Sequence, residues 1–417
     1  MSSAAHEPSS PSLARWLTLV GVGADGVAGL AEEARAAVAS ASLVVGGRRQ
    51  LALVASLVRG DTYAWPSPIE PGIAHVLARR GQPTCVLASG DPFWYGIGAT
   101  LARTLDREEL SCIPAPSSMS LAAARLGWPL QDLDVVSLHG RELTSLVRHL
   151  APGRRVLALS WDRETPLAIA RLLVEHGYGG SRLLVLEALG GPDEDVHSFR
   201  ASQLAATQAP SFDDLNLVAL ELEGEGRAQQ LATRACLPDS AFEHDGQLTK
   251  RDVRAVTLSA LAPWPGALLW DVGAGAGSVA IEWLRAHPAC RAVAIEQDGS
   301  RVQRIRKNAH ALGVPALEVM HARAPDGLAG LPAPNAVFIG GGGGDLTVFE
   351  RCWEALTSGG RLVFNAVTLE SEAMLLALYA RYGGELCRIS IEHAAPLGKL
   401  TAYRPAMPIV QWRIDKS

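Results

Sequence analysis

The sequence predicts an α/β protein made of two consecutive units, and three observations lead to this prediction. The chain has 417 residues, which suits two or three domains better than one. Short apolar runs alternate with Ala-, Leu- and Arg-rich segments of helical period, a pattern typical of mainly parallel sheets covered by helices. Finally, a glycine-rich turn between a strand-like and a helix-like run occurs twice, at Leu17–Gly26 and at Asp271–Leu284.

Composition and charge narrow the class of protein. Hydrophobic residues make up 48% of the chain and charged residues 19%, so it can bury a large core. The net charge of −5 argues against a general nucleic-acid binder, yet local arginines can still bind an anionic small molecule. The six cysteines contain no C-x-x-C pair and the eleven histidines no H-x-x-x-H pair. We therefore expect no metal site, no disulfides and a reducing, cytoplasmic location.

The N-terminus and the apolar runs indicate neither export nor membrane insertion. Residues 1–14 lack the basic segment and apolar core of a signal peptide, and we expect them to form a disordered tail. The chain has no apolar run of about 18 residues, the length that a membrane span needs.

The first series of alternating elements ends near residue 222. Its expected strands are Leu17–Val22, Leu43–Val45, Thr84–Ala88, Val135–Leu138, Val156–Leu159, Leu183–Glu187 and Leu217–Leu222. A looser segment separates the last two, so we expect an antiparallel arrangement there. The polar stretch Glu223–Arg234 then interrupts the pattern and is typical of a linker.

The second series contains about seven expected strands. They are Leu268–Val272, Ala292–Glu296, Leu317–His321, Ala336–Ile339, Leu362–Asn365, Leu386–Glu392 and a final pair, Leu400–Tyr403 and Ile409–Arg413. The proline-rich turn Arg404–Pro408 is too short for a helical crossover, so we expect the final pair to be antiparallel at a sheet edge.

The second glycine turn, DVGAGAGSVAIEWL, favours a nucleoside over a dinucleotide. Gly273, Gly275 and Gly277 spell G-x-G-x-G instead of G-x-G-x-x-G, and no lysine provides a Walker loop. Such a turn lets a ligand approach the backbone and exposes N–H groups at a helix start. Glu296 ends the next expected strand 19 residues after Gly277, where a carboxylate can accept both ribose hydroxyl protons. This is the arrangement of a class I S-adenosylmethionine methyltransferase; the alternative is a tight packing turn and an exposed acid.

Upstream of this turn, the stretch QLTKRDVRAVTLSAL predicts a helix. Thr249 and Asp252 have capping-box spacing, so spacing alone favours a helix cap for Thr249.

In order along the second unit come PDSAFEHDGQLTKRDVRAVTLSAL, LLWDVGAGAGSVAIEW, AVAIEQD, ARAPDGL and AVFIGGGGG. They resemble the cobalamin-pathway methyltransferase domain that methylates the 15-position of a precorrin and removes a carboxyl group. The resemblance implies that the contacts to S-adenosylmethionine come from Thr249, Gly273, Ala274, Gly275, Ala276, Gly277, Glu296 and Ala324. The family often has an acid or amide before the Ala-Pro pair, where this chain has Arg323. Arg323 is therefore available to face the substrate.

The first unit contains three further motifs. LTLVGVGADG places Gly21 and Gly23 in a turn after a strand, and LASGDPFWYGIGATLAR places an aromatic run after Gly90-Asp91-Pro92. CIPAPSSMSLAAARLGWPLQD carries Ser117 and Ser118. Taken singly, each has a structural alternative: a simple βα turn, an acid that fixes a turn, and a helix cap.

Together these three motifs resemble the tetrapyrrole methylase family, whose two α/β lobes hold S-adenosylmethionine between them. VLEALGGPDEDVHSF and FDDLNLVALEL match its C-terminal lobe, and the spacing is similar to the methylase of the 5-position. The resemblance implies cofactor contacts, largely through backbone, from Gly21, Gly23, Gly90, Asp91, Pro92, Ser117 and Ser118. Pro114-Ala115 stands where the family has Pro-Gly, which leaves the role of the serines open.

We therefore expect a tail at residues 1–14, a two-lobed tetrapyrrole methylase domain at 15–224, a linker at 225–236, and a Rossmann-like class I methyltransferase domain at 237–417. This order resembles the precorrin-6Y C5,15-methyltransferase (decarboxylating) family of cobalamin biosynthesis. The implied reaction consumes two molecules of S-adenosylmethionine, methylates precorrin-6B at the 5- and 15-positions, and releases carbon dioxide from the ring C acetate to give precorrin-8. The resemblance also implies a homo-oligomer.

Substrate carboxylates call for cationic partners near the second site. We expect these from His244, Lys250, Arg251 and Arg323, with His321 a weaker choice. The alternative is that these side chains are solvated surface charges.

A bifunctional methyltransferase that acts on another tetrapyrrole or small molecule is the competing enzyme. A nucleotide-responsive binding protein is the competing class, against which the intact glycines and Glu296 argue. Nucleic-acid methylation is disfavoured because GGGGG follows Ala336–Ile339, where a D/N-P-P-aromatic motif is needed.

Overall fold

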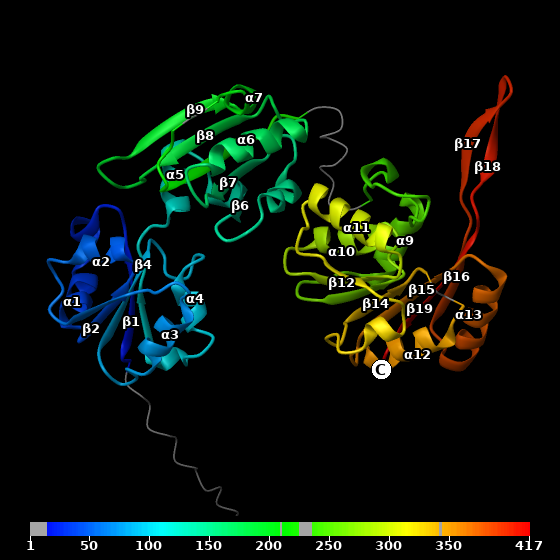
Figure 1. The fold of residues 1–417 in the computed structure, drawn as a ribbon, viewed down its shortest axis with the longest axis horizontal. Coiled ribbons are helices and arrows are strands. Elements are labelled where there is room, and N and C mark those ends of the chain that lie inside the picture. Colours follow the sequence, from blue (N-terminus) through cyan, green and yellow to red (C-terminus); the bar gives the residue numbers. More distant parts are fainter. Residues whose placement is uncertain (1–14, 209–210, 225–235, 342–343) are drawn as a thin grey trace, which may run out of the picture. The chain divides into compact units, whose positions relative to one another are not determined.

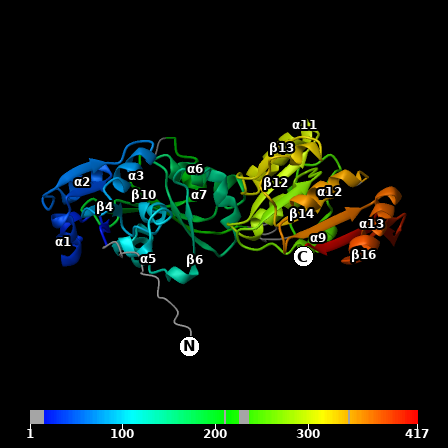
Figure 2. The same cartoon turned by 90° about the horizontal axis from the view of Figure 1, so that it is seen from below.

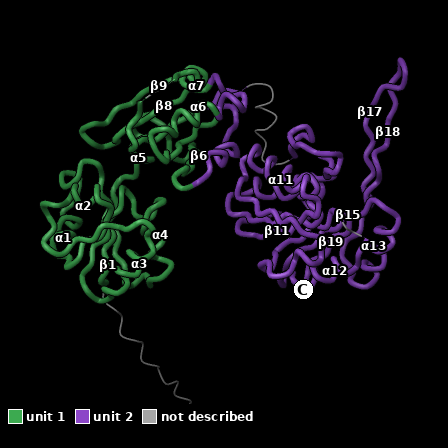
Figure 3. The backbone as a smooth tube through the Cα atoms, viewed as in Figure 1, with its two compact units in different colours: residues 1–140, 154–171, 181–221 green, residues 141–153, 172–180, 222–417 purple. Residues whose placement is uncertain are grey.

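The computed structural model describes residues 15–208, 211–224, 236–341 and 344–417. These fall into two compact units (Figure 3). Unit 1 comprises the described parts of residues 1–140, 154–171 and 181–221, and unit 2 those of residues 141–153, 172–180 and 222–417. The expected N-terminal tail and most of the expected linker lie outside the described residues.

Unit 1 begins with a parallel five-stranded sheet of order β3-β2-β4-β1-β5 (Figure 1). Its elements are β1 Leu17–Val22, α1 Glu32–Ser40, β2 Leu43–Gly46, α2 Arg48–Val54, β3 Asp61–Ala64, α3 Glu70–Leu77, β4 Thr84–Ser89, α4 Ile97–Leu101 and β5 Leu110–Ile113. The apolar run of β1 is buried on both faces: Val20 and Val22 join the core with α1 and α2, while Leu17 and Leu19 join the core with α3 and α4. This burial places β1 near the middle of the sheet.

The second lobe of unit 1 is a mixed sheet of order β6-β7-β10-β8-β9. Its elements are α5 Ser118–Leu126, β6 Leu133–Ser137, β7 Arg155–Leu159, α6 Thr165–Glu175, β8 Arg182–Glu187, β9 Asp195–Arg200, α7 Ala201–Ala205 and β10 Asn216–Glu221. The expected antiparallel arrangement of the strands near Leu183 and Leu217 is confirmed, because β8 pairs antiparallel with β10. The expected two-lobed α/β architecture is therefore present.

Unit 2 contains a seven-stranded sheet of order β13-β12-β11-β14-β15-β19-β16 (Figures 1 and 2). Its elements are α9 Arg251–Leu261, β11 Leu268–Val272, α10 Ser278–Ala286, β12 Arg291–Glu296, α11 Gly299–Ala311, β13 Glu318–His321, β14 Ala336–Ile339, α12 Leu346–Ala355, β15 Arg361–Ala366, α13 Leu369–Tyr382, β16 Glu385–Ile389 and β19 Ile409–Asp415. Alternate residues of the central strands pack against α9, α10 and α11 on one face and against α12 and α13 on the other. This three-layer arrangement confirms the expected Rossmann-like fold.

The C-terminal strands differ from expectation. The expected strand Leu386–Glu392 is divided between β16 and β17 (Glu392–Leu397), and β17 pairs with β18 (Leu400–Pro405) as a separate hairpin. The last strand, β19, is antiparallel as expected, but it pairs with β15 and β16 instead of with β18 and does not form the edge. The prediction of one terminal pair was wrong because β17–β18 extends away from the sheet (Figure 1). Among the described residues, no helix combines the length and apolar character needed to cross a membrane.

Candidate cofactor and substrate sites

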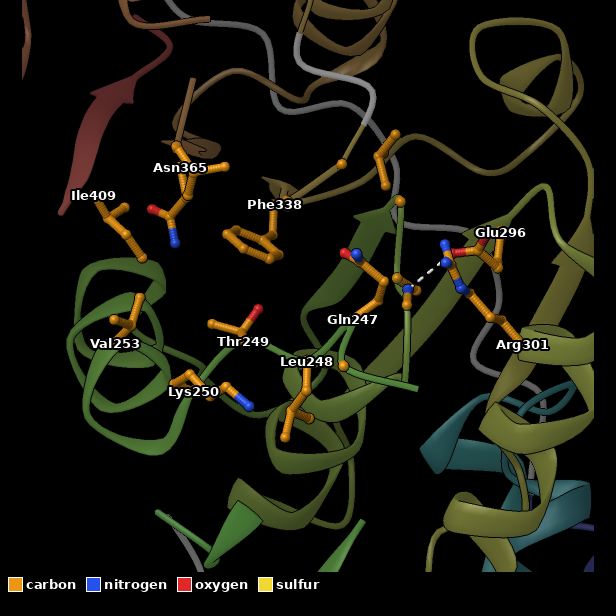
Figure 4. Close-up of a pocket in the computed structure, with 18 of the residues that line it drawn as sticks. Gln247, Leu248, Thr249, Lys250, Val253, Glu296, Arg301, Phe338, Asn365 and Ile409 are labelled. Atoms are coloured by element: carbon orange, nitrogen blue, oxygen red, sulfur yellow. Dashed lines mark hydrogen bonds between the residues drawn. The ribbon is translucent and has the colours of Figure 1, made fainter. Parts of the chain in front are cut away.

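A cavity of about 1220 Å³ opens at the carboxyl ends of β11, β12, β14 and β15. Ligands bind at this edge of parallel α/β sheets. A pocket for one drug-sized ligand measures roughly 300–1,000 Å³, so this cavity has room for a cofactor and part of a second molecule. Figure 4 shows Glu296 and Arg301 at one end, and Asn365, Ile409 and Val253 at the other.

The glycine turn after β11 forms part of the cavity wall. Gly273 and Gly275 have φ of +72° and +58°, in the left-handed region that favours glycine. A Cβ at Gly273 would lie 2.6 Å from the Gly341 Cα, and one at Gly275 would lie 2.8 Å from the Gln247 carbonyl oxygen. The site therefore needs glycine at both positions, and its shape suits a ligand that lies close to the backbone.

Most N–H groups within the turn already have partners in the protein. The amides of Gly273 and Ala274 donate to the Ile295 carbonyl, at 2.9 and 3.1 Å, and the Gly277 amide donates to the Ala274 carbonyl. Gly273, Ala274 and Gly275 line the cavity. Ala276, 1% exposed, and Gly277, which precedes α10, instead pack behind the turn.

Glu296 lies where the ribose of a nucleoside is expected. It ends β12, lines the cavity and is only 4% exposed. Its Oε2 accepts the Gly275 amide at 2.9 Å and its Oε1 accepts the Asp298 amide at 3.0 Å, which fixes the carboxylate. A carboxylate has about four acceptor positions, so two remain for ribose hydroxyls.

A second carboxyl group is buried beneath the turn. Asp271, 1% exposed, accepts the Ala280 amide on Oδ2 at 3.0 Å. Burial raises the pKa of Asp271 to about 7, and the nearby charge of Glu296 adds to that rise.

Thr249 lines the cavity and does not cap α9. The residue at the helix N-cap is Lys250, which makes no side-chain cap. The interpretation of Thr249 as a helix cap, which spacing favoured, is therefore wrong. The Thr249 carbonyl accepts Nη1 of Arg254 at 2.5 Å, so the backbone here is fixed from behind by α9.

Three of the four cations expected near the substrate line the same cavity: Lys250, Arg251 and Arg323. Hydrogen bonds from Thr347 are the main cause of the lowered pKa of Asp345, and the positive charge of Arg323 adds a smaller effect. His244 is not among the lining residues, and its Nδ1 accepts the Gly246 amide. His321, the weaker choice, does not line the cavity and has its Nε2 3.2 Å from the Gln297 carbonyl oxygen.

The sequence did not indicate several lining residues. Arg301 lines the cavity next to Glu296 and donates from Nε to Asp245 at 3.0 Å. Its position on the first turn of α11, just after the acid, was the available signal. Asn365 and Gln247 also line the cavity, but neither belongs to a recognisable spacing.

In unit 1, the end of β1 meets the turns after β4 and β5. The expected placement of Gly21 in a turn is wrong, because Gly21 belongs to β1 and pairs with Ala88 of β4. A Cβ at Gly21 would lie 2.0 Å from the Gly90 carbonyl oxygen and 2.4 Å from the Ala115 nitrogen. The Ala115 amide in turn donates to the Gly90 carbonyl at 3.3 Å. A Cβ at Gly90 would lie 2.9 Å from the Ser117 Cα. The structure thus brings together the three motifs expected to hold the first cofactor.

Two polar side chains of these turns accept hydrogen bonds from nearby backbone amides and so stabilise the local backbone. Asp91 Oδ1 accepts the Phe93 amide at 2.8 Å, and Ser117 caps α5 by accepting the Ser120 amide at 3.2 Å. Ser118 is the first residue of α5, and a Cβ at Gly23 would lie 2.5 Å from Asp25 Oδ1. The structural alternatives for Asp91 and Ser117 are confirmed.

The aromatic run beside Pro92 remains exposed. Phe93, Trp94 and Tyr95 are 46%, 47% and 50% exposed, an unusual amount for three consecutive large side chains. Trp94 and Tyr95 meet edge to face, with ring centroids 5.7 Å apart. They form an apolar surface next to the convergent turns.

Two family models match the chain: tetrapyrrole (corrin/porphyrin) methylases over residues 16–205, and the precorrin methyltransferase domain over residues 240–416. With the two folds and the glycine turns, these matches define an S-adenosylmethionine-dependent methyltransferase. The precorrin-6Y C(5,15)-methyltransferase [decarboxylating] of a Sinorhizobium species is 52% identical over 402 residues, 96% of each chain. The chain belongs to the precorrin-6Y C(5,15)-methyltransferase (decarboxylating) family.

Two further relatives extend this comparison. The protein of the same name from Mycobacterium tuberculosis is 42% identical over 400 residues, which cover 96% of this chain and 100% of that one. Among solved structures, the C-terminal domain of precorrin-6Y C5,15-methyltransferase from Rhodobacter capsulatus is 47% identical, covers 44% of this chain and all of its own, and has a TM-score of 0.42.

Proposed function

We propose that this chain uses two S-adenosylmethionine sites to methylate precorrin-6B at the 5- and 15-positions and to remove the ring C acetate carboxyl group, giving precorrin-8. The observation that carries the proposal is the presence of two glycine-rich segments, one at the end of β1 with Gly21 and one after β11 with Gly273, each at the carboxyl end of parallel strands in a separate sheet. The names of relatives that align over nearly the whole chain support the choice of substrate. We assign the two steps to residues 15–224 and 237–417, joined by a linker at 225–236.

The residues of unit 2 fit the cofactor that the family requires. When bound, S-adenosylmethionine supplies an electrophilic methyl group. Glu296 would hold the ribose hydroxyls, the turn Gly273–Gly275 would border the sulfonium, and the backbone near Ala324 would contact the adenine. Because the cofactor carries the reactivity, these residues act by orientation.

The substrate would occupy the rest of the cavity. Lys250, Arg251 and Arg323 would bind the peripheral carboxylates of the tetrapyrrole. The bridging carbons of a reduced tetrapyrrole are enamine-like nucleophiles, so attack on the methyl group needs no strong base. The conjugated ring accepts the electron pair left when carbon dioxide departs.

In unit 1, the convergent turns would hold the second cofactor, mainly by shape and backbone. Gly21, Gly90 and the segment from Pro92 to Ser118 border this place, and the exposed aromatic run offers a flat surface for a macrocycle. Here too the side chains would orient the reactants without taking part in bond making.

We also propose a homo-oligomer and a cytoplasmic location. The hairpin β17–β18 exposes Leu397, Leu400 and Tyr403 by 59%, 75% and 74%, and such apolar side chains suit contact with a second copy. All six cysteines are free thiols, which suits a reducing compartment.

Incubation of the full chain with precorrin-6B and S-adenosylmethionine, followed by mass spectrometry, tests this function. We expect a product that has gained two methyl groups and lost one carbon dioxide. Recovery of unchanged precorrin-6B, while another tetrapyrrole is methylated, would reject the substrate but keep the enzyme class.

A further inference from the structure

Three polar side chains meet at the end of the cavity opposite Glu296. Asn365 comes from the end of β15, Thr257 from the middle of α9 and Gln411 from β19. Thr257 and Gln411 are 0% and 3% exposed, whereas Asn365 lines the cavity. Figure 4 shows the Asn365 amide on the cavity side of its strand, close to Ile409 and facing Val253.

Hydrogen bonds fix the orientation of the Asn365 amide. Gln411 Nε2 donates to Asn365 Oδ1 at 2.9 Å and to Thr257 Oγ1 at 3.2 Å, and Asn365 Nδ2 donates to the same Thr257 oxygen at 2.9 Å. A primary amide has two N–H donors and two acceptor positions. Asn365 therefore keeps one N–H and one lone pair beyond this triad, on an amide that cannot rotate without losing both bonds.

Apolar side chains form much of the cavity wall near Asn365. Val253, Phe338 and Ile409 line this end of the cavity, and Val253 and Phe338 are only 5% and 2% exposed. A polar group in such a wall carries a desolvation cost unless it meets a partner, and single polar groups in apolar pockets commonly fix the orientation of a ligand.

The sheet order places Asn365 on the acceptor side of the cofactor. Glu296 lies on β12 and Asn365 on β15, and the strands β11 and β14 lie between them in the sheet. That is three strand spacings, about 14 Å. The ribose hydroxyls and the methyl carbon of S-adenosylmethionine are only a few bonds apart. When Glu296 holds the ribose, Asn365 therefore lies beyond the methyl carbon, next to the molecule that accepts the methyl group.

We propose that Asn365 is a specificity-determining residue of the second methylation site: its free N–H binds the carboxylate of the acetate that is lost, and Thr257 and Gln411 are the positioning residues that hold the amide. This inference rests on the function proposed above. Lys250, Arg251 and Arg323 bind the carboxylates that are retained.

A neutral donor suits the carboxylate that must leave. As the ring carbon forms its bond to the methyl group, the bond between that methyl group and sulfur breaks and the ring gains one positive charge. Loss of carbon dioxide then breaks the bond between the acetate methylene and carboxyl carbons, and its electron pair neutralises that charge and leaves an exocyclic methylene. The methylene takes up one proton as the methylated bridging carbon releases one, so the former acetate becomes a methyl group with no net change in protons. An arginine at the carboxylate would stabilise the ground state and lose its ion pair in this step, whereas an amide orients the group at a smaller cost. In Figure 4 the Lys250 nitrogen points toward Leu248, away from Asn365.

The test uses the full chain with precorrin-6B, comparing wild type with Asn365→Leu and Asn365→Ser. We expect KM for precorrin-6B in the decarboxylating step to rise about tenfold or more in both, as for a lost hydrogen bond to a charged group. Affinity for S-adenosylhomocysteine and methylation at the 5-position stay at the wild-type level. Thr257→Val should show an intermediate KM, and Thr257→Ser, which keeps the hydroxyl, should restore it.

Asn335→Leu is the matched control. Its Oδ1 accepts the Leu268 amide at 2.9 Å and its Nδ2 donates to Thr357 at 3.4 Å, away from the cavity lining. It should lower the melting temperature while leaving KM unchanged. An unchanged KM in both Asn365 variants, or an equal loss of S-adenosylhomocysteine affinity, overturns the inference. If wild type itself leaves precorrin-6B unchanged, the proposed function has failed instead.

Discussion

Arg254 on α9 donates from Nε to Glu282 Oε1 on α10 at 2.6 Å, and both side chains are completely buried. Glu282 also accepts the amides of Cys236 and Leu237 at 2.6 and 3.0 Å. Arg254 donates further to the carbonyls of Leu237 and Thr249. The pair thus ties the segment that enters the domain to the backbone of a cavity-lining residue.

Removing one partner of this pair should be costly. We expect Arg254→Met to lower the free energy of unfolding of the C-terminal domain by about 3–5 kcal/mol, because Glu282 stays buried without its counter-charge. The double variant Arg254→Met, Glu282→Gln should lose less than the single one. Urea denaturation followed by tryptophan fluorescence measures both, and a loss below about 1 kcal/mol in the single variant would contradict the structural role assigned here.

The glycine turn of unit 2 should not tolerate a side chain at Gly275. In Gly275→Ala, the methyl group meets the Gln247 carbonyl and φ of +58° becomes strained, so this site should no longer bind S-adenosylhomocysteine. Gly330→Ala is the control, since φ there is +76° but nothing lies within 4 Å of its Cβ. Calorimetry should detect loss of one site in the first variant only.

The N-terminal turns give a complementary prediction. Gly21→Ala inserts a methyl group where the Gly90 carbonyl and the Ala115 amide already meet, so the turns after β4 and β5 should move away from the end of β1. Methylation at the 5-position should be lost while methylation at the 15-position and decarboxylation persist. Mass spectrometry of the product distinguishes the two, and simultaneous loss of both activities would argue against independent sites.

Asp271 should make stability depend on pH. Its pKa is about 7 in the folded protein against 3.8 for the free group, mainly because it is buried. Between these values the folded state holds a proton that the unfolded state has released, so this group's contribution to stability falls as pH rises. The stability of Asp271→Asn relative to wild type should therefore grow from about pH 4 to about pH 7 and then level off. Denaturation curves at several pH values test this; a constant difference would contradict it.

The central strands and both glycine turns were predictable because they are local features. β11, LLWDV, is buried at every position, and four of its five residues are apolar. The three unexpected strands of unit 1, β3, β5 and β9, all lie at sheet edges. Edge strands need no continuous apolar run, and DVHSFR of β9 shows none.

The positions of Gly273 and Glu296 in the cavity wall were predictable because each belongs to a local sequence motif. Thr249 was misjudged because capping-box spacing is common, whereas α9 begins one residue later, with Lys250 at its N-cap. The Thr249 carbonyl instead accepts a hydrogen bond from Arg254, which Glu282 of α10 holds in place. Asn365, Thr257 and Gln411 are 46 to 154 residues apart in sequence, and only the packing of β15 and β19 against α9 brings them together. No local pattern marks such a cluster.

The most direct test of two methyl-donor sites is their count in the intact protein. Titration of the full chain with S-adenosylhomocysteine by calorimetry should give two bound molecules, and Gly21→Ala and Gly275→Ala should each give one. A wild-type chain that binds a single molecule, with the same stoichiometry in one of these variants, would contradict the account.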